Sequence, residues 1–354
     1  MLKKNIQNNK KNILILSDSY HPKLNSGAIM IEDLINYISS KYNIILLTFD
    51  HTIKKKYILS KFNNYIIIRL KTNSNRNHLT RFISEYSYSN KIIDFFSKHN
   101  FINIDYVINY SPSIFFGKSV NYLKKKYECN SYLIQRDLFP DWAYDQGLIK
   151  FKFIYNYLKK KEIVKYDSST FIGVESKGAY KYINNIGYKN SEILNNWIMN
   201  SYLKSDITIK KKYNLKKKYK YFMYGGNLGI AQNLVKLISS LNFNHLKKNN
   251  IKIIICGSGS EINEILKIIK FSLGTVEYYG LLKRKEYNYV LNKCVGAIVS
   301  LSSKTSMNNY PLKFIDYIRC GVPVIAHLNK NNELSNFITK NNIGLCSHAE
   351  EFDL

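Results

Sequence analysis

The chain has 354 residues, of which 45% are hydrophobic, so it is too long for one typical core and too apolar for a disordered protein. The formal net charge is +28, because 53 Lys and Arg face 25 Asp and Glu. The lysines are scattered and accompany no nucleic-acid-binding motif, so we expect compositional drift with attraction to an anionic membrane surface rather than a nucleic-acid partner.

Five widely spaced cysteines without a C-x-x-C pair are typical of a reduced cytoplasmic protein and argue against disulfides and a cysteine metal site. The apolar run Ile13–Leu16 is too short for a signal peptide. No segment approaches the apolar length that crosses a bilayer. We therefore expect a cytoplasmic protein that is soluble or peripheral on the inner face of the plasma membrane.

Alternating strand and helix patterns fill the first part of the chain. It begins with a buried strand at 12–17, a loop that contains Gly27 and an amphipathic helix. Further strands are predicted at 44–49, 65–70 and 106–110, with helices near 79–98 and 113–127. This alternation predicts an α/β domain with a parallel, doubly wound sheet, and it places Gly27 at the edge where such sheets bind ligands.

The next predicted strand ends at Gln135 and is followed by the charged pair Arg136 and Asp137. Charged groups at the carboxyl end of a central strand face the ligand crevice of such a sheet, which makes Asp137 a candidate for catalysis on the acceptor side. An ion pair that only closes the loop is an equally good interpretation.

Residues 151–166 form a predicted basic helix with an aromatic and aliphatic side. Such a helix packs on the sheet or lies in a membrane interface, and we favour packing with membrane contact as a secondary role. A strand at 170–174 follows, and the polar, Lys-rich segment 201–218 is typical of a linker. The predicted domains are therefore 1–200 and 201–354.

The second domain opens with a strand at 219–224 that runs into a glycine-rich loop containing Gly225, Gly226 and Gly229. Glycines let the backbone approach a ligand closely, and consecutive N–H groups form an anion-binding concavity. A tight turn is the alternative, which we rank lower because three glycines occur in five residues.

Residues 308–326, NNYPLKFIDYIRCGVPVIA, predict a short helix followed by a buried strand. Pro311 suits the first turn, and Gly321 suits the end of the helix. One apolar face is predicted from Leu312, Ile315 and Ile318.

Lys313 and Asp316 are three residues apart, so they project from one side of this helix. A helix N-terminus with a Lys favours an anion, and a carboxylate accepts hydrogen bonds from sugar hydroxyls. The pair therefore suggests a ligand in which a sugar carries phosphate. The alternative is a solvated helix face.

The same stretch resembles the signature helix of retaining family 4 glycosyltransferases, whose two Glu are spaced E-x7-E. Here the two positions are Asn308 and Asp316, an amide and a shorter carboxylate. RDLFPDWAYDQGLI at 136–149, NW at 196–197 and GNLGIAQN at 226–233 are similar to the branch that adds amino sugars such as N-acetylfucosamine to surface polysaccharides.

This resemblance implies the GT-B fold, in which two Rossmann-like domains face each other across a cleft. The first domain would bind a saccharide or lipid-linked acceptor and the second a nucleotide sugar, in particular a UDP-sugar. Asn308, Lys313 and Asp137 become the catalytic candidates, and Asp316 would accept the ribose hydroxyls. The other donor-binding candidates are Gly27, Gly225, Gly226, Asn227, Gln232, Gly257, Gly259, Leu282, Lys283, Tyr310, Pro311 and Leu312.

Within this set, Gly257 and Gly259 would border the nucleotide, and backbone groups around Leu282 and Lys283 would hold the base. The wider family usually has Arg and Lys at the positions of Asn227 and Gln232, so Lys313 would supply the positive charge. The resemblance also implies retention of configuration without a metal. One alternative is a nucleotide-sugar epimerase of the same fold. The other is an inactive sugar- or membrane-binding subunit, suggested by the lack of the family's usual C-terminal crossover helix and by the weakened E-x7-E pattern.

Overall fold

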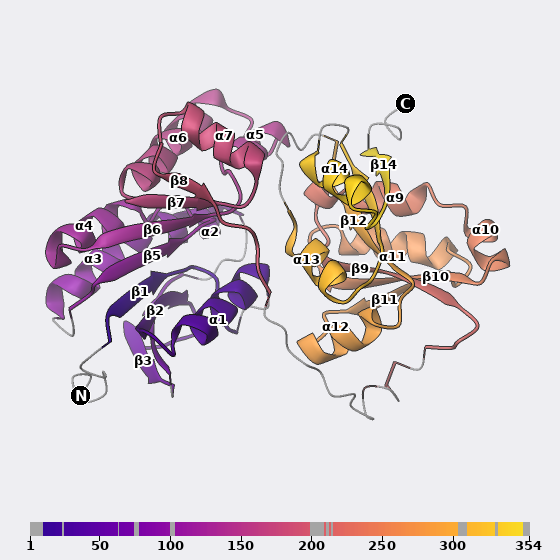
Figure 1. Ribbon diagram of the computed structural model, residues 1–354, viewed down its shortest axis with the longest axis horizontal. Helices are drawn as coiled ribbons and strands as arrows, with labels where there is room; N and C mark the ends of the chain where they lie inside the picture. The colour runs from indigo at the N-terminus through magenta and orange to yellow at the C-terminus, as the bar shows by residue number, and fades with distance from the viewer. Residues whose placement is uncertain are drawn as a thin grey trace. The chain divides into compact units, whose positions relative to one another are not determined.

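The chain forms two compact units, Met1–Asn196 (unit 1) and Trp197–Leu354 (unit 2). Each unit is an α/β domain built on one sheet (Figure 1). The boundary lies shortly before the predicted one after residue 200, which is outside the described residues. The computed structural model describes residues 10–22, 25–62, 64–73, 78–99, 103–198, 209, 212–213, 215–303, 310–329 and 332–349.

The sheet of unit 1 has the strand order β3-β4-β2-β1-β5-β6-β7-β8, and only β3 pairs antiparallel with its neighbour. The strands are β1 (Asn12–Leu16), β2 (Asn43–Asp50), β3 (Tyr57–Lys61), β4 (Tyr65–Lys71), β5 (Tyr106–Tyr110), β6 (Asn130–Gln135), β7 (Phe171–Val174) and β8 (Ser191–Ile193). All five residues of β1 are buried, as expected of a central parallel strand whose two faces are both covered.

The helices of unit 1 are α1 (Ser26–Ile38), α2 (His78–Tyr86), α3 (Tyr88–Lys98), α4 (Gly117–Tyr127), α5 (Asp141–Asp145), α6 (Lys152–Asp167) and α7 (Lys177–Asn185). The single helix predicted near 79–98 is therefore two helices that meet at Ser87. Strand β3 was not predicted from the sequence, because its five residues alternate only weakly between half-buried and exposed positions.

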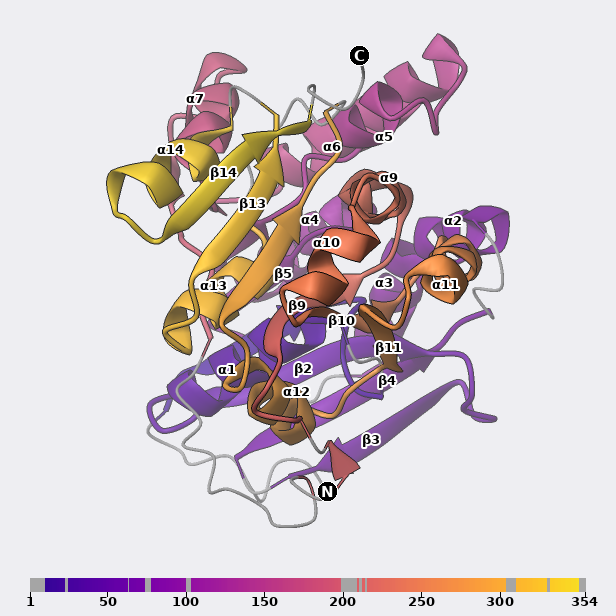
Figure 2. The ribbon, with the colours of Figure 1, turned by 90° about the vertical axis from the view of Figure 1, so that its right-hand side faces the viewer.

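The sheet of unit 2 is parallel, with the strand order β11-β10-β9-β12-β13-β14. Its strands are β9 (Lys220–Asn227), β10 (Ile251–Ser258), β11 (Val276–Gly280), β12 (Gly296–Ser300), β13 (Val324–Leu328) and β14 (Gly344–His348). Figure 2 shows β13 and β14 of this sheet side by side. The strand order reverses between β9 and β12, so the loop after β9 lies at the point where open α/β sheets bind ligands.

The helices of unit 2 are α9 (Leu234–Ser239), α10 (Phe243–Lys248), α11 (Ile262–Phe271), α12 (Arg284–Leu291), α13 (Leu312–Arg319) and α14 (Glu333–Lys340), with a short 3-10 turn at Ile230–Gln232. Within the described part of the chain, no helix is long and apolar enough to cross a membrane.

Helix α13 begins and ends as predicted, and its aromatic side chains are the most deeply buried. Phe314 and Tyr317 are its buried apolar side chains and belong to the main core of unit 2. Of the predicted apolar face, Ile315 and Ile318 pack against the same core but stay half-buried, as does Leu312. Aromatic side chains bury more apolar area than aliphatic ones, and they determine which face turns inward.

Candidate functional site

The glycine-rich loop of unit 2 lies directly against the amine of Lys313. Gly226 has a φ of +144°, a conformation that other residues rarely adopt. A Cβ at Gly226 would lie 3.0 Å from Cε and 3.1 Å from Nζ of Lys313. The sequence predicted that this glycine and this lysine act together, and the fold brings the start of α13 and the end of β9 into contact.

Lys313 has a hydroxyl and an aromatic ring as its neighbours. Its Nζ donates a hydrogen bond of 2.6 Å to Oη of Tyr224 and lies 3.9 Å from the centre of that ring. The Tyr224 hydroxyl in turn donates to the carbonyl of Asn227 at 2.7 Å. Burial lowers the pKa of Lys313 to about 7. No acid in the described part of the chain forms an ion pair with this amine, so an anion would stabilise its charged form.

Two further tyrosines, Tyr317 and Tyr287, contact the glycine-rich loop at Gly225. The backbone N–H of Gly225 donates to Oη of Tyr317 at 3.0 Å. A Cβ at Gly225 would lie 2.4 Å from a ring carbon of Tyr287. Gly225 is therefore required by the packing of a tyrosine, and its contact with a ligand stays a prediction.

The loop after β10 packs on the glycine-rich loop with almost no space between the two backbones. Gly257 has a φ of +140°, and a Cβ there would lie 1.8 Å from the carbonyl oxygen of Gly226. A Cβ at Gly259 would lie 2.2 Å from the carbonyl oxygen of Leu228. Both glycines thus fix the shape of the anion-binding candidate. Their contact with a nucleotide stays a prediction.

The two amides that replace the family's Arg and Lys close the loop on itself. The side chain of Asn227 donates to Oε1 of Gln232 at 2.9 Å, and the N–H of Gly229 donates to the same oxygen at 3.2 Å. These contacts order the loop but supply no positive charge. The positive charge next to the glycine-rich loop is therefore that of Lys313.

Asp316 has partners that differ from the predicted ribose hydroxyls. Its buried carboxylate accepts two hydrogen bonds of 2.8 Å from the guanidinium of Arg284, one on each oxygen. Arg319 adds a contact of 3.1 Å to Oδ1. Binding of ribose hydroxyls by Asp316 stays a prediction.

Arg284 was not identified from the sequence. The chain contains only six arginines among its many lysines. A planar guanidinium binds a carboxylate through two parallel hydrogen bonds, which a lysine cannot reproduce. The presence of Arg284 and Arg319 in a Lys-rich chain was therefore the available signal for this cluster.

In the predicted base-binding segment, the backbone groups of Lys283 form hydrogen bonds to residues of α12. The N–H of Lys283 donates to Oε2 of Glu286 at 3.0 Å, and its carbonyl accepts from the N–H of Tyr287 at 2.9 Å. Leu282 is partly buried against the core of unit 2. The backbone groups of Lys283 are thus engaged in the first turn of α12, and base binding around Leu282 and Lys283 stays a prediction.

Near the start of α13, Pro311 precedes the first helical residue, and its carbonyl accepts from the N–H of Phe314 at 2.9 Å. The ring of Tyr310 packs edge-on against Phe337, with 5.9 Å between ring centres. Leu312 is half-buried. The catalytic candidate Asn308 lies outside the described residues.

Gly27 and Asp137 belong to unit 1. Gly27 lies in the first turn of α1, where a Cβ would be 3.1 Å from the ring of Tyr110, so this glycine lets the helix pack on β5. Asp137 is exposed just after the carboxyl end of β6. Its neighbour Arg136 is buried and donates to the carbonyl of Leu194 at 2.9 Å.

A second acid, Glu175, lies buried at the carboxyl end of β7 and was not predicted from the sequence. The side-chain amide of Asn196 donates to its carboxylate at 2.9 Å. Burial, reinforced by the charge of Asp137, raises the pKa of Glu175 to about 7. An acid directly after a buried strand was the signal that could have identified it.

Within the described ranges, no group of three or more His, Cys, Asp and Glu is placed to hold a metal ion. The five cysteines are free thiols.

Comparisons with known proteins bear on the family and the fold. Residues 205–351 match the family described as glycosyl transferases group 1. None of the curated proteins compared with the chain matches it. A sucrose-phosphate synthase from Thermosynechococcus elongatus is similar in structure, with 12% identity and a TM-score of 0.72 over 97% of this chain and 87% of that chain.

Two other solved structures have the same fold. One is WaaG, a glycosyltransferase involved in lipopolysaccharide biosynthesis, with 10% identity and a TM-score of 0.67 over 96% of this chain and 88% of that chain. The other is an α,α-trehalose-phosphate synthase (UDP-forming) from Burkholderia xenovorans in complex with glucose-6-phosphate, with 9% identity and a TM-score of 0.66 over 97% and 90%. The predicted GT-B fold is thereby confirmed.

Proposed function

We propose that the protein is a glycosyltransferase that moves a sugar from a nucleotide-sugar donor, held by unit 2, to a saccharide or lipid-linked acceptor, held by unit 1. One observation carries this proposal. The Lys313 amine rests on the Gly226 backbone without an acid partner in the described chain, inside the stretch 205–351 that matches glycosyl transferases group 1.

The donor in this proposal is a UDP-sugar. The charged amine of Lys313 and the N–H groups of the glycine-rich loop bind its diphosphate, because both favour negative charge. A bound diphosphate raises the pKa of Lys313 from its value of about 7, so binding is coupled to the uptake of a proton near neutral pH. The similar trehalose-phosphate synthase is a UDP-forming enzyme, which supports UDP as the leaving nucleotide here.

The chemistry is electrostatic. When the bond between the sugar and the diphosphate breaks, negative charge grows on the departing phosphate while the sugar becomes positively charged. A preorganised cation next to that phosphate lowers the barrier, since it needs no rearrangement at the moment of reaction. We propose retention of configuration and no metal requirement, on the family resemblance of residues 308–326.

The pathway in this proposal is the synthesis of a surface polysaccharide such as a capsule or lipopolysaccharide. The support is the resemblance of residues 136–149 and 226–233 to enzymes that add amino sugars, together with the structural similarity to WaaG, which takes part in lipopolysaccharide biosynthesis. Free cysteines fit a reducing cytoplasm, where we place the reaction.

The test compares the wild type with Lys313→Ala, and with Lys340→Ala as a control on the exposed end of α14. Calorimetry with UDP should show a loss of about 10- to 100-fold in affinity for Lys313→Ala alone, the range expected for a hydrogen bond to a charged group. Transfer from a panel of nucleotide sugars should fall in the same variant and survive EDTA. Equal UDP affinity in all three proteins contradicts the proposal.

A second candidate, an inactive nucleotide-binding subunit, is favoured by Asp316, because Arg284 and Arg319 already occupy its carboxylate. This candidate predicts that UDP binds with the same dependence on Lys313, whereas no donor in the panel is turned over with any acceptor.

A further inference from the structure

The segment around the start of α6 exposes a set of large apolar side chains. Phe151 is 59% exposed and Phe153 is 71% exposed. Leu158 is buried underneath, against Ile114 and Phe115 of the same unit. Packing of α6 on its unit, which the sequence favoured, therefore leaves its aromatic start uncovered. The exposed apolar residues of this segment are Tyr144, Leu148, Phe151, Phe153, Ile154 and Tyr157.

Helix α2 extends this surface, which was not foreseen from the sequence. The amine of Lys161 lies 5.1 Å from the ring centre of Tyr157 on α6 and 5.5 Å from that of Tyr86 on α2. Tyr86 and Ile83 on α2 are themselves exposed. We call the exposed residues of 144–157 together with Ile83 and Tyr86 the basic apolar surface.

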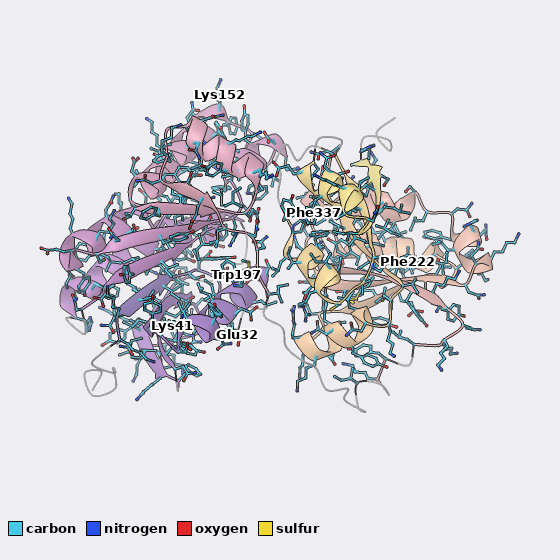
Figure 3. All side chains as sticks on the ribbon, in the orientation of Figure 1. Glu32, Lys41, Lys152, Trp197, Phe222 and Phe337 are labelled. Atoms are coloured by element: carbon cyan, nitrogen blue, oxygen red, sulfur yellow. The ribbon has the colours of Figure 1, made fainter. Side chains whose placement is uncertain are left out.

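The charge of this surface is positive. Residues 146–161 contain five lysines and no acid. Lys150, Lys152 and Lys160 are exposed, and Figure 3 shows Lys152 pointing away from the ribbon of its unit. The acids of the three helices are Glu85 on α2, Asp141 and Asp145 on α5, and Glu162 and Asp167 on α6. Asp141 and Glu162 are largely buried and both pair with Lys159, so the exposed part of residues 146–161 remains positively charged.

We infer that the basic apolar surface docks on an anionic lipid membrane. Phenylalanine and aliphatic side chains enter the boundary between headgroups and acyl chains, while lysines reach anionic headgroups with their long stems. A second copy of the chain is a poor occupant, because two surfaces of a protein with a net charge of +28 repel each other. Nucleic acid would leave Leu148 and Ile154 without a role. This inference goes beyond glycosyl transfer and does not depend on Lys313.

The experiment is flotation of the full chain with vesicles at physiological salt. One set contains equal parts of phosphatidylglycerol and phosphatidylcholine, and the other phosphatidylcholine alone. The variants are Phe151→Ser with Phe153→Ser, and Lys150→Gln with Lys152→Gln. The matched controls are Phe271→Ser, which removes a ring that is 77% exposed on α11, and Lys247→Gln with Lys248→Gln on α10.

The wild type should bind anionic vesicles at least tenfold more tightly than neutral ones. The double Phe variant should lose roughly tenfold or more, and each lysine about fivefold, while the controls match the wild type. Thermal unfolding checks that every variant is folded. Four outcomes overturn the inference: no vesicle binding, equal loss in the controls, a dimer in sedimentation that only the Phe variant dissociates, or displacement of the protein from vesicles by a short duplex.

Discussion

Replacing Lys313 by methionine tests whether the charged amine destabilises the ligand-free fold, as expected of a site that binds an anion. Methionine keeps an unbranched chain of similar length and removes the charge. Burial lowers the pKa of Lys313 from 10.5 to about 7. At about 1.4 kcal/mol for each pKa unit, the charged amine destabilises the ligand-free fold by about 5 kcal/mol at pH 6. Loss of the hydrogen bond to Tyr224 costs the variant about 1 kcal/mol, so we expect a net gain of about 4 kcal/mol.

The stability difference between Lys313→Met and the wild type should depend on pH. The folded protein releases the proton of Lys313 near pH 7, whereas the unfolded chain holds it until about pH 10.5. Between these values the unfolded state binds more protons, so wild-type stability rises with pH. The advantage of Lys313→Met should therefore shrink to about 1 kcal/mol at pH 9.

The assay is chemical denaturation at pH 6 and pH 9, followed by hydrogen exchange in β9 and β10 so that unit 2 is observed separately. Lys340→Met, on the exposed end of α14, is the control and should match the wild type at both pH values. UDP should stabilise the wild type and not Lys313→Met. A Met variant that is less stable at pH 6, or whose difference from the wild type is the same at both pH values, refutes the reasoning.

Two further predictions concern buried acids. Asp316→Ala leaves the guanidinium of Arg284 without its carboxylate and should lower the free energy of unfolding by about 3–5 kcal/mol. The double variant Asp316→Leu with Arg284→Leu should recover part of this loss. A loss below about 1 kcal/mol in Asp316→Ala contradicts the observed ion pair. Glu175 has a pKa raised from 4.5 to about 7, so the folded state keeps its proton longer and wild-type stability falls between these pH values. Glu175→Gln should be more stable than the wild type by about 3 kcal/mol at pH 8 and equally stable at pH 4, as measured by urea denaturation. A stability difference that does not depend on pH argues against a raised pKa of Glu175.

The sequence could predict where candidate site residues lie, but not all of the contacts that they make within the protein. The sequence placed Lys313 beside an anion site, and its amine does rest on the glycine-rich loop. The resemblance implied ribose hydroxyls as partners of Asp316, and the structure adds Arg284 and Arg319, which the sequence did not predict. At Lys283, the N–H of the predicted base-binding segment donates to Glu286 three residues later, a local contact that was not predicted.

By itself the sequence determined that the chain forms two α/β units, because runs of β-branched residues and helical apolar spacing act over a few neighbours. It also determined where α13 starts and stops, through Pro311 and Gly321. Only the tertiary structure decided the partners of the polar groups. Tyr224 is 89 residues from Lys313, and Arg284 is 32 residues from Asp316. Such contacts form when the sheet brings distant strand ends together, and no local pattern encodes which side chains then meet.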